Sequence, residues 1–237
     1  MATTIRTLAN CIGVSEDISV LRHFIGFIRG VIPGDPTGVA TEISLLEQAR
    51  LMQRDHFHVN VIRVGSDQFE DPDHEEIDYS IYRLRNIYGA ENVGVGRVEH
   101  YRVLTADADG LDAPNGKSEV EEITERWFVA NDGIDIFIPF DMSNAGRLGR
   151  SVTGGPCEDK ENKGGMDASV AGIWGKEQTS RTFAHELGHY LGLDHENDRP
   201  ENLMAQSGEA SSIRDSVELR NSQVSEIRDH CLMDGGC

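Results

Sequence analysis

The segment TSRTFAHELGHYLGLDH, residues 179–195, decides how this sequence is interpreted. Thr179 and Ser180 are of the residue types that cap helix N-termini, and good helix formers follow them. Gly192 accepts the positive φ at which many helices end. The segment therefore predicts a helix that stops at Gly192 and is followed by a sharp turn.

The same segment carries three histidines and one glutamate in a fixed pattern. His185 and His189 are four residues apart, so their imidazoles share one helix face, with Cβ atoms about 6 Å apart. A turn at Gly192 brings His195 back toward this pair as a third nitrogen ligand. Glu186 lies on the adjoining surface of the helix, where its carboxylate reaches a metal-bound water. Three protein ligands with a fourth position open are typical of a catalytic zinc site.

Chance explains this pattern poorly. A chain of this composition would contain the five fixed positions in roughly one case in 10⁴. The shorter pattern H-E-x-x-H would be a weaker signal, because histidines at i and i+4 also occur on solvated helix faces. We therefore predict that His185, His189 and His195 bind Zn²⁺ and that Glu186 is the general base.

The full run H-E-x-x-H-x-x-G-x-x-H resembles the metzincin clan of zinc peptidases. In that clan a methionine turn lies beneath the metal, and here ENLMAQ supplies Met204, nine residues after His195. A core methionine that only fills a gap is the alternative. The resemblance implies an α/β metzincin fold: a twisted, mixed and mostly parallel sheet with the active-site helix and a C-terminal helix. It also implies a zinc metalloendopeptidase that cleaves proteins or peptides.

Two further stretches are similar to one metzincin subfamily, the reprolysins. GRLGRSVTGGPC (146–157) resembles their edge strand and the cysteine after it, and DHCLM (229–233) resembles their C-terminal cysteine region. The resemblance implies a Cys157–Cys231 disulfide, which leaves Cys11 and Cys237 as a second pair. Four reduced, buried thiols are the alternative. The subfamily stays open, because HELGH is shared with matrixins and Glu196 is the residue type of astacins, yet no tyrosine follows Met204.

The metzincin resemblance also implies a substrate-binding edge strand that pairs with an extended peptide. Its candidate residues are Leu148, Gly149, Arg150, Ser151 and Val152. An ordinary loop at the sheet margin is the alternative. Residues 205–219 would then wall the pocket for the side chain just past the scissile bond, and their chemistry indicates no preference.

The rest of the sequence alternates predicted strands with predicted helices, as α/β domains do. Phe57, Val59 and Val61 alternate as in a strand with one buried face, and Ser118 with Glu121 forms a capping box. The predicted strands are 57–65, 93–104 and 134–140, and the predicted helices are 41–54, 77–88, 118–127 and 217–231. A Pro/Gly cluster at 30–38 predicts a linker. Residues 1–50 are thus expected to be an N-terminal extension or pro-segment, and 51–237 the catalytic domain.

Composition limits the partners and the compartment. Asp and Glu number 41 against 22 Lys and Arg, a net charge of -19 that disfavours nucleic acid and anionic membranes. No stretch approaches the roughly 18 apolar residues of a membrane span. MATTIRTLAN lacks the apolar core of a secretory signal, so a signal was either removed or never present. Four cysteines, an even number, favour disulfides in an oxidising compartment, so the protein is expected to be secreted or extracytoplasmic. A monomer is also expected.

Two other groups of residues carry weaker signals. Asp107, Asp109 and Asp112 alternate as in calcium loops, so Ca²⁺ is one interpretation, but a solvated acidic turn is favoured because the trailing glutamate of an EF-hand is missing. Four further histidines show no metal-ligand spacing and are interpreted as strand or surface residues: His56, His58, His74 and His100. The rival functions are a zinc-binding module without catalysis and a hydrolase of non-peptide amides.

Overall fold

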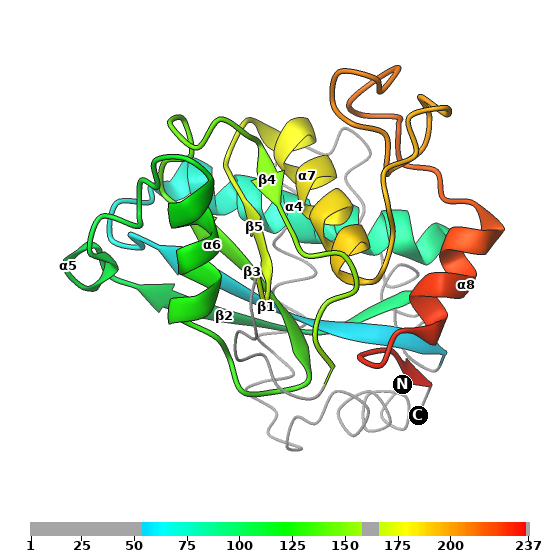
Figure 1. The fold of residues 1–237 in the computed structure, drawn as a ribbon, viewed down its shortest axis with the longest axis horizontal. Coiled ribbons are helices and arrows are strands. Elements are labelled where there is room, and N and C mark those ends of the chain that lie inside the picture. Colours follow the sequence, from blue (N-terminus) through cyan, green and yellow to red (C-terminus); the bar gives the residue numbers. More distant parts are fainter. Residues whose placement is uncertain (1–53, 158–165, 236–237) are drawn as a thin grey trace.

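The computed structural model describes residues 54–157 and 166–235 (Figure 1). Four predictions lie outside these residues: the extension or pro-segment at 1–50, the linker at 30–38, the helix at 41–54 and the Cys11–Cys237 pair. In the two described ranges, no helix combines the length and the apolar character needed to cross a membrane.

Strands and helices alternate through most of the described chain. In order they are β1 (Asp55–Val64), α4 (Asp71–Ala90), β2 (Gly94–Val103), α5 (Thr105–Ala108), α6 (Lys117–Arg126), β3 (Gly133–Pro139), β4 (Gly149–Arg150), β5 (Ser169–Ala171), α7 (Lys176–Tyr190), α8 (Asn221–Asp229) and β6 (Asp234–Gly235). The predicted strands and helices within this range are all present. Their ends differ from the predicted ends by a few residues. The differences are largest at the first residues of α4 and α8.

The sheet is mixed and mostly parallel, as predicted. Its strand order is β2-β1-β3-β5-β4, with β6 paired to β1. β1 pairs in parallel with β2 and β3, and β3 pairs in parallel with β5. β4 runs antiparallel to β5, and β6 runs antiparallel to β1. β4 is therefore an edge strand among the strands that the structure describes.

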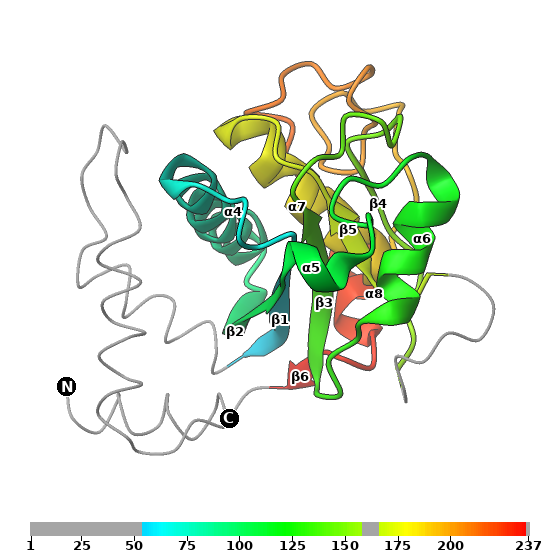
Figure 2. The ribbon, with the colours of Figure 1, turned by 90° about the vertical axis from the view of Figure 1, so that its left-hand side faces the viewer.

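Helices cover both faces of the sheet. Phe57, Val59 and Val61 of β1 pack in one hydrophobic cluster with α4, α7 and α8, whereas Ile62 and Val64 pack in a second cluster with α6. Figure 2 shows α4 and α6 on opposite sides of the strands. The prediction that β1 has a single buried face is wrong, because a central strand of a parallel sheet is covered on both sides.

Helix α7 begins at Lys176, three residues before the predicted cap at Thr179 or Ser180. The Glu76 carboxylate of α4 accepts a hydrogen bond from the Gly175 backbone N–H at 2.7 Å, and the Thr179 hydroxyl, inside the helix, donates to the same carboxylate. An acidic group at a helix N-terminus stabilises the helix dipole. The cap thus comes from a distant helix, and this also fixes α7 against α4.

The predicted capping box of α6 is wrong as well. The helix begins at Lys117, so Ser118 lies inside its first turn. The N-cap residue is Gly116, which has no side chain to cap the helix, and the Glu119 carboxylate accepts a hydrogen bond from the Asn115 backbone N–H just before it, at 2.6 Å. Glu121 instead forms ion pairs, one of them with a side chain of β4.

The predicted Cys157–Cys231 disulfide is present, with the two Cα atoms 5.6 Å apart. It joins the segment that follows β4 to the segment that follows α8. Two parts of the domain that are 74 residues apart in sequence are therefore linked covalently.

Removal of this disulfide is expected to lower the free energy of unfolding by about 3 to 5 kcal/mol, because a long closed loop restricts the unfolded chain. The test compares urea unfolding of wild type with that of the double variant Cys157→Ser and Cys231→Ser. Reduced wild type serves as the control and should match the variant. A difference below about 1 kcal/mol would contradict a stabilising role.

Candidate metal centre

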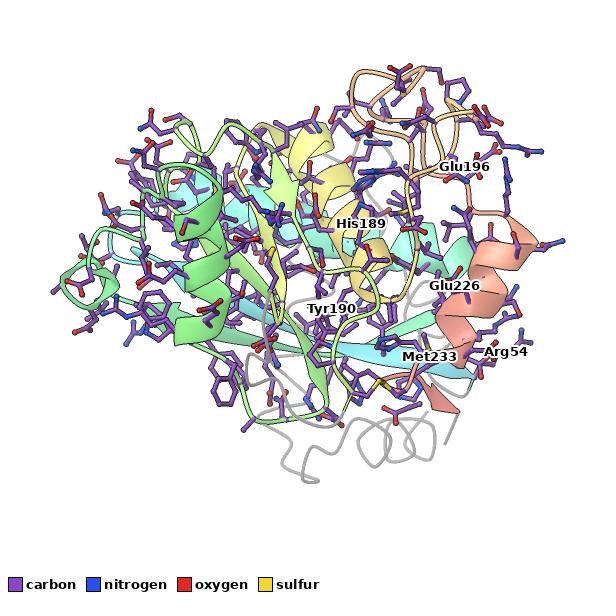
Figure 3. All side chains as sticks on the ribbon, in the orientation of Figure 1. Arg54, His189, Tyr190, Glu196, Glu226 and Met233 are labelled. Carbon is purple, nitrogen blue, oxygen red and sulfur yellow. A yellow bond between two sulfur atoms is a disulfide. The ribbon has the colours of Figure 1, made fainter. Side chains whose placement is uncertain are left out.

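Three histidines converge at the C-terminal end of α7. His185 and His189 lie on the helix, and His195 lies on the segment beyond it. Their ring centroids are 4.6 to 5.3 Å apart, and one ligand atom from each lies within 4.8 Å of the others. Gly192 has the predicted positive φ of 108°, which turns the chain back toward the helix. Figure 3 shows His189 on α7 beside the segment that carries Glu196.

Hydrogen bonds leave the outer nitrogen of two rings free to bind a metal. The Nδ1–H of His185 donates to the Leu203 carbonyl at 2.8 Å, and the Nδ1–H of His189 donates to the Leu193 carbonyl at 2.6 Å. Each ring then carries a lone pair on Nε2. The Nε2 atoms of His189 and His195 are 3.2 Å apart. Two nitrogens bound to one tetrahedral zinc at about 2.0 to 2.1 Å are separated by about 3.4 Å, so the donor set fits zinc.

Burial also favours the uncharged form of these histidines. It lowers the pKa of His185 to about 3, with a further contribution from the neighbouring His189. Burial likewise lowers the pKa of His189 and of His195. Neutral imidazoles at pH 7 are the form that binds a metal cation, so no proton has to be displaced from the coordinating nitrogens.

Glu186 lies one residue after the first histidine and is 6% exposed. Burial raises its pKa to about 8, and the positive charges of Arg150 and Arg147 act in the opposite direction. A carboxyl group with a raised pKa can both take up and release a proton near neutral pH. The ionised form, which a general base needs, is favoured by Arg150 and Arg147 and would be favoured further by a bound cation.

Strand β4 passes directly over Glu186. A Cβ atom at Gly149 would lie 2.7 Å from Glu186 Oε1 and 2.7 Å from Thr182 Cγ2, so a larger residue would collide with the helix. Gly149 also faces Ala171 of β5, and the Gly172 N–H donates to the Leu148 carbonyl at 2.9 Å. Because successive residues of a strand point their backbone groups to opposite sides, the N–H and C=O of Gly149 face the open edge.

A cleft of about 420 Å³ lies between β4 and α7. It is lined by Arg147, Leu148, Gly149, Arg150, Ser151, Arg181, Thr182, His185, Glu186, His189, His195, Gln206 and Ser207. Four of the five residues predicted for substrate binding are thus at the cleft. The fifth, Val152, lies beyond β4 and packs against the hydrophobic core.

Met204 lies fully buried beneath the histidines. A Cβ atom at Gly188, between the two helical ligands, would lie 2.7 Å from Met204 Sδ. The Met204 N–H donates to Asn202 Oδ1 at 2.8 Å, and the Asn202 side chain is bonded to Gln223 of α8 at 2.9 Å. The methionine therefore packs against the turn of α7 between His185 and His189, and α8 supports the segment that holds it.

Arg181 of α7 is a residue that sequence reasoning missed. Its side chain is 3% exposed and donates to the backbone carbonyls of Leu203 at 3.0 Å, Ser216 at 3.0 Å and Ala205. A charged hydrogen bond typically contributes about 1.5 to 3 kcal/mol, so this group fixes the chain after Met204 to the active-site helix. In the sequence it resembles any helical arginine, and no local pattern distinguishes it.

The acidic loop does not bring its three carboxylates together. Asp109 pairs with Arg126 at 2.8 Å, and Asp112 accepts a hydrogen bond from Gln68 at 2.6 Å. Within the described ranges, the groups of potential metal ligands do not include Asp107, Asp109 or Asp112. The calcium interpretation thus gains no support. The loop is less solvated than expected, since it buries Leu111 in the cluster beneath α6, and Leu111 is 4% exposed.

A second histidine pair lies near the C-terminus, where the sequence showed no ligand spacing. His56, His58 and Asp234 have ligand atoms within 4.8 Å of one another. However, His58 Nδ1 accepts a hydrogen bond from the Arg97 N–H at 2.9 Å. The neutral ring then carries its proton on Nε2 and has no lone pair left for a metal. This group is therefore a poorer metal site than the one on α7.

Comparisons with known proteins agree with this geometry. A family model described as metallo-peptidase family M12, of the reprolysin type, matches residues 92–234, which is more than half of the chain. No curated protein matches the sequence.

Solved structures with a similar fold include a metalloproteinase-II from Bacteroides fragilis, with 13% identity and a TM-score of 0.50 over 76% of this chain and 54% of that one. An archaemetzincin from Methanopyrus kandleri matches with 15% identity and a TM-score of 0.46, over 73% of this chain and 95% of that one. This chain spans about half the length of the Bacteroides protein.

Proposed function

Because this chain belongs to metallo-peptidase family M12, we propose that it is a zinc-dependent endopeptidase whose metal is held by His185, His189 and His195. The observation that carries the proposal is the convergence of three imidazoles beside a buried carboxylate, Glu186, in a cleft beneath an edge strand. Neither the metal group alone nor the cleft alone would indicate peptide hydrolysis.

The metal and the residues around the cleft would each have a separate role in peptide hydrolysis. Bound zinc supplies a positive charge that acidifies water and stabilises negative charge on a carbonyl oxygen. Glu186 accepts the proton of the attacking water and then delivers it to the leaving amine. The carbonyls of Leu203 and Leu193 hold the ligand rings of His185 and His189 in the metal-binding tautomer. No covalent enzyme intermediate is required.

Strand β4 is the proposed docking site for the substrate backbone. Its side away from β5 has no partner strand among those described, and the N–H and C=O of Gly149 face that side. An extended peptide can add there as a further antiparallel strand. Because Gly149 lies over Glu186, this pairing would place the scissile bond beside the general base.

The purified protein is expected to hold close to one zinc ion per chain and to cleave peptides until a strong chelator removes the metal. Elemental analysis after dialysis measures the zinc, and quenched-fluorescence peptides measure cleavage. Readdition of zinc should restore cleavage. Cleavage that survives in metal-free protein would refute the proposal, because the metal site is its basis.

We also propose that the protein acts in an oxidising compartment. Its Cys157–Cys231 disulfide links two parts of the catalytic domain, and such bonds persist outside the reducing cytosol. Mass mapping of the protein isolated from its source under thiol-blocking conditions tests this. Recovery of free Cys157 and Cys231 would contradict it.

A further inference from the structure

The cleft is positively charged in a strongly negative chain. Acidic residues outnumber basic ones by 41 to 22 over the whole sequence. Among the described residues that line the cleft the balance is reversed, because Arg147, Arg150 and Arg181 accompany one carboxylate, Glu186. This local reversal indicates a ligand of negative charge.

The three arginines differ in what already binds them. Arg181 donates to backbone carbonyls, and Arg150 forms an ion pair with Glu121 of α6. Arg147 has no ion pair with any residue in the described ranges, and its Nε donates to the Ala145 carbonyl at 3.4 Å. Arg181 is thus held by three backbone carbonyls and Arg150 by a carboxylate, whereas Arg147 has one long hydrogen bond and no carboxylate partner among the described residues.

The position of Gly149 determines which residues of β4 would lie beside each part of a bound peptide. Gly149 lies over Glu186, so the scissile bond of a bound peptide lies beside Gly149. In an antiparallel pair, residues later in the peptide lie beside residues earlier in the strand. Arg147 is therefore placed near the first two substrate residues after the scissile bond, whereas Arg150 is placed near the residues before it.

We propose that this protein prefers peptides with Asp or Glu one or two residues after the scissile bond and that Arg147 determines this preference. The inference rests on the proposed function and adds the substrate class to it. A guanidinium binds a carboxylate through two parallel hydrogen bonds, and a partly enclosed cleft strengthens that pair relative to open water. Gln206 and Ser207 add polar side chains to the same cleft.

The first test measures kcat/KM for quenched peptides that differ only in Glu, Gln or Lys at the first and second positions after the scissile bond. Wild type should prefer Glu to Gln by about tenfold, the ratio given by 1.4 kcal/mol, and should cleave the Lys peptides most slowly. Arg147→Gln should remove the preference. Arg102→Gln, an exposed charge on the opposite edge strand β2, should retain it and serves as the matched control.

Mass spectrometry of the products locates the cleaved bond in each peptide. Equal kcat/KM for the Glu and Gln peptides in wild type would overturn the inference, and so would a preference that Arg147→Gln leaves intact. Neither result would affect the proposed endopeptidase activity, which requires only that peptides are cleaved.

A second test measures peptide binding, so it can be carried out even if no peptide is cleaved. Absence of cleavage would refute the proposed function but not this inference. Zinc-loaded Glu186→Gln protein is titrated with fluorescently labelled Glu and Gln peptides, and the dissociation constants are read from anisotropy. A Kd for the Glu peptide several-fold below that for the Gln peptide, abolished by adding Arg147→Gln, supports the inference. Equal Kd values overturn it.

Discussion

Glu186→Gln is expected to lower kcat/KM for peptide cleavage by about 10³- to 10⁴-fold while the protein keeps its zinc. General base catalysis contributes about 10²- to 10⁴-fold, and here one carboxylate both accepts the water proton and returns it to the amine, which favours the upper end. The amide keeps the size of the side chain beneath Gly149, so the cleft should retain its shape. Peptide cleavage and zinc content are measured on the same samples.

Glu196→Gln is the matched control for this variant. Glu196 follows the third histidine and pairs with Arg220 at 2.9 Å, outside the cleft lining. Its substitution should change kcat/KM by less than about threefold, because Glu196 does not line the cleft and a partly exposed ion pair contributes little. Undiminished cleavage by zinc-loaded Glu186→Gln would show that another group activates the water.

His189→Ala is expected to lose both the metal and the activity. It removes one of three nitrogen ligands and leaves two, which is below the number found in catalytic zinc sites. Dialysed protein should contain little zinc, and cleavage should fall to the background rate. His74→Ala, on α4 outside the cleft, should retain full zinc and activity. A His189→Ala protein with full zinc would show that the metal is held elsewhere.

Glu186→Gln and His189→Ala together distinguish loss of water activation from loss of metal binding. Glu186→Gln tests a group that acts on the water, whereas His189→Ala tests a group that acts on the metal. Loss of zinc in both would mean that Glu186 supports the site structurally. A binding module without catalysis would lose metal in His189→Ala and show no cleavage in any variant, wild type included.

Local spacing explains why so much of the site could be predicted from the sequence. The i and i+4 positions of His185 and His189, and the turn at Gly192, are determined within a few residues by helix geometry. Strand β3 and helix α6 are likewise indicated by short patterns of apolar residues. The mixed, mostly parallel sheet followed from the alternation of these elements and from the metzincin resemblance.

The features that were missed depend on contacts between distant residues. The start of α7 is set by Glu76, about 100 positions earlier, and Ser118 lost its capping role because α6 begins one residue before it. The role of Gly149 depends on how closely β4 approaches Glu186, and Arg147 lacks a carboxylate partner among the described residues because of where its neighbours lie in the fold. These contacts join residues that are distant in sequence, so no local sequence pattern predicts them.

Arg181 has a consequence for substitutions in the segment that follows Met204. Its guanidinium binds the backbone near Met204 and again at Ser216, so it anchors both ends of the segment between them to the active-site helix. The anchors are carbonyl groups, which every residue type provides. We therefore expect substitutions in segment 208–215, which lies between these anchors and outside the cleft lining, to leave the metal ligands in place.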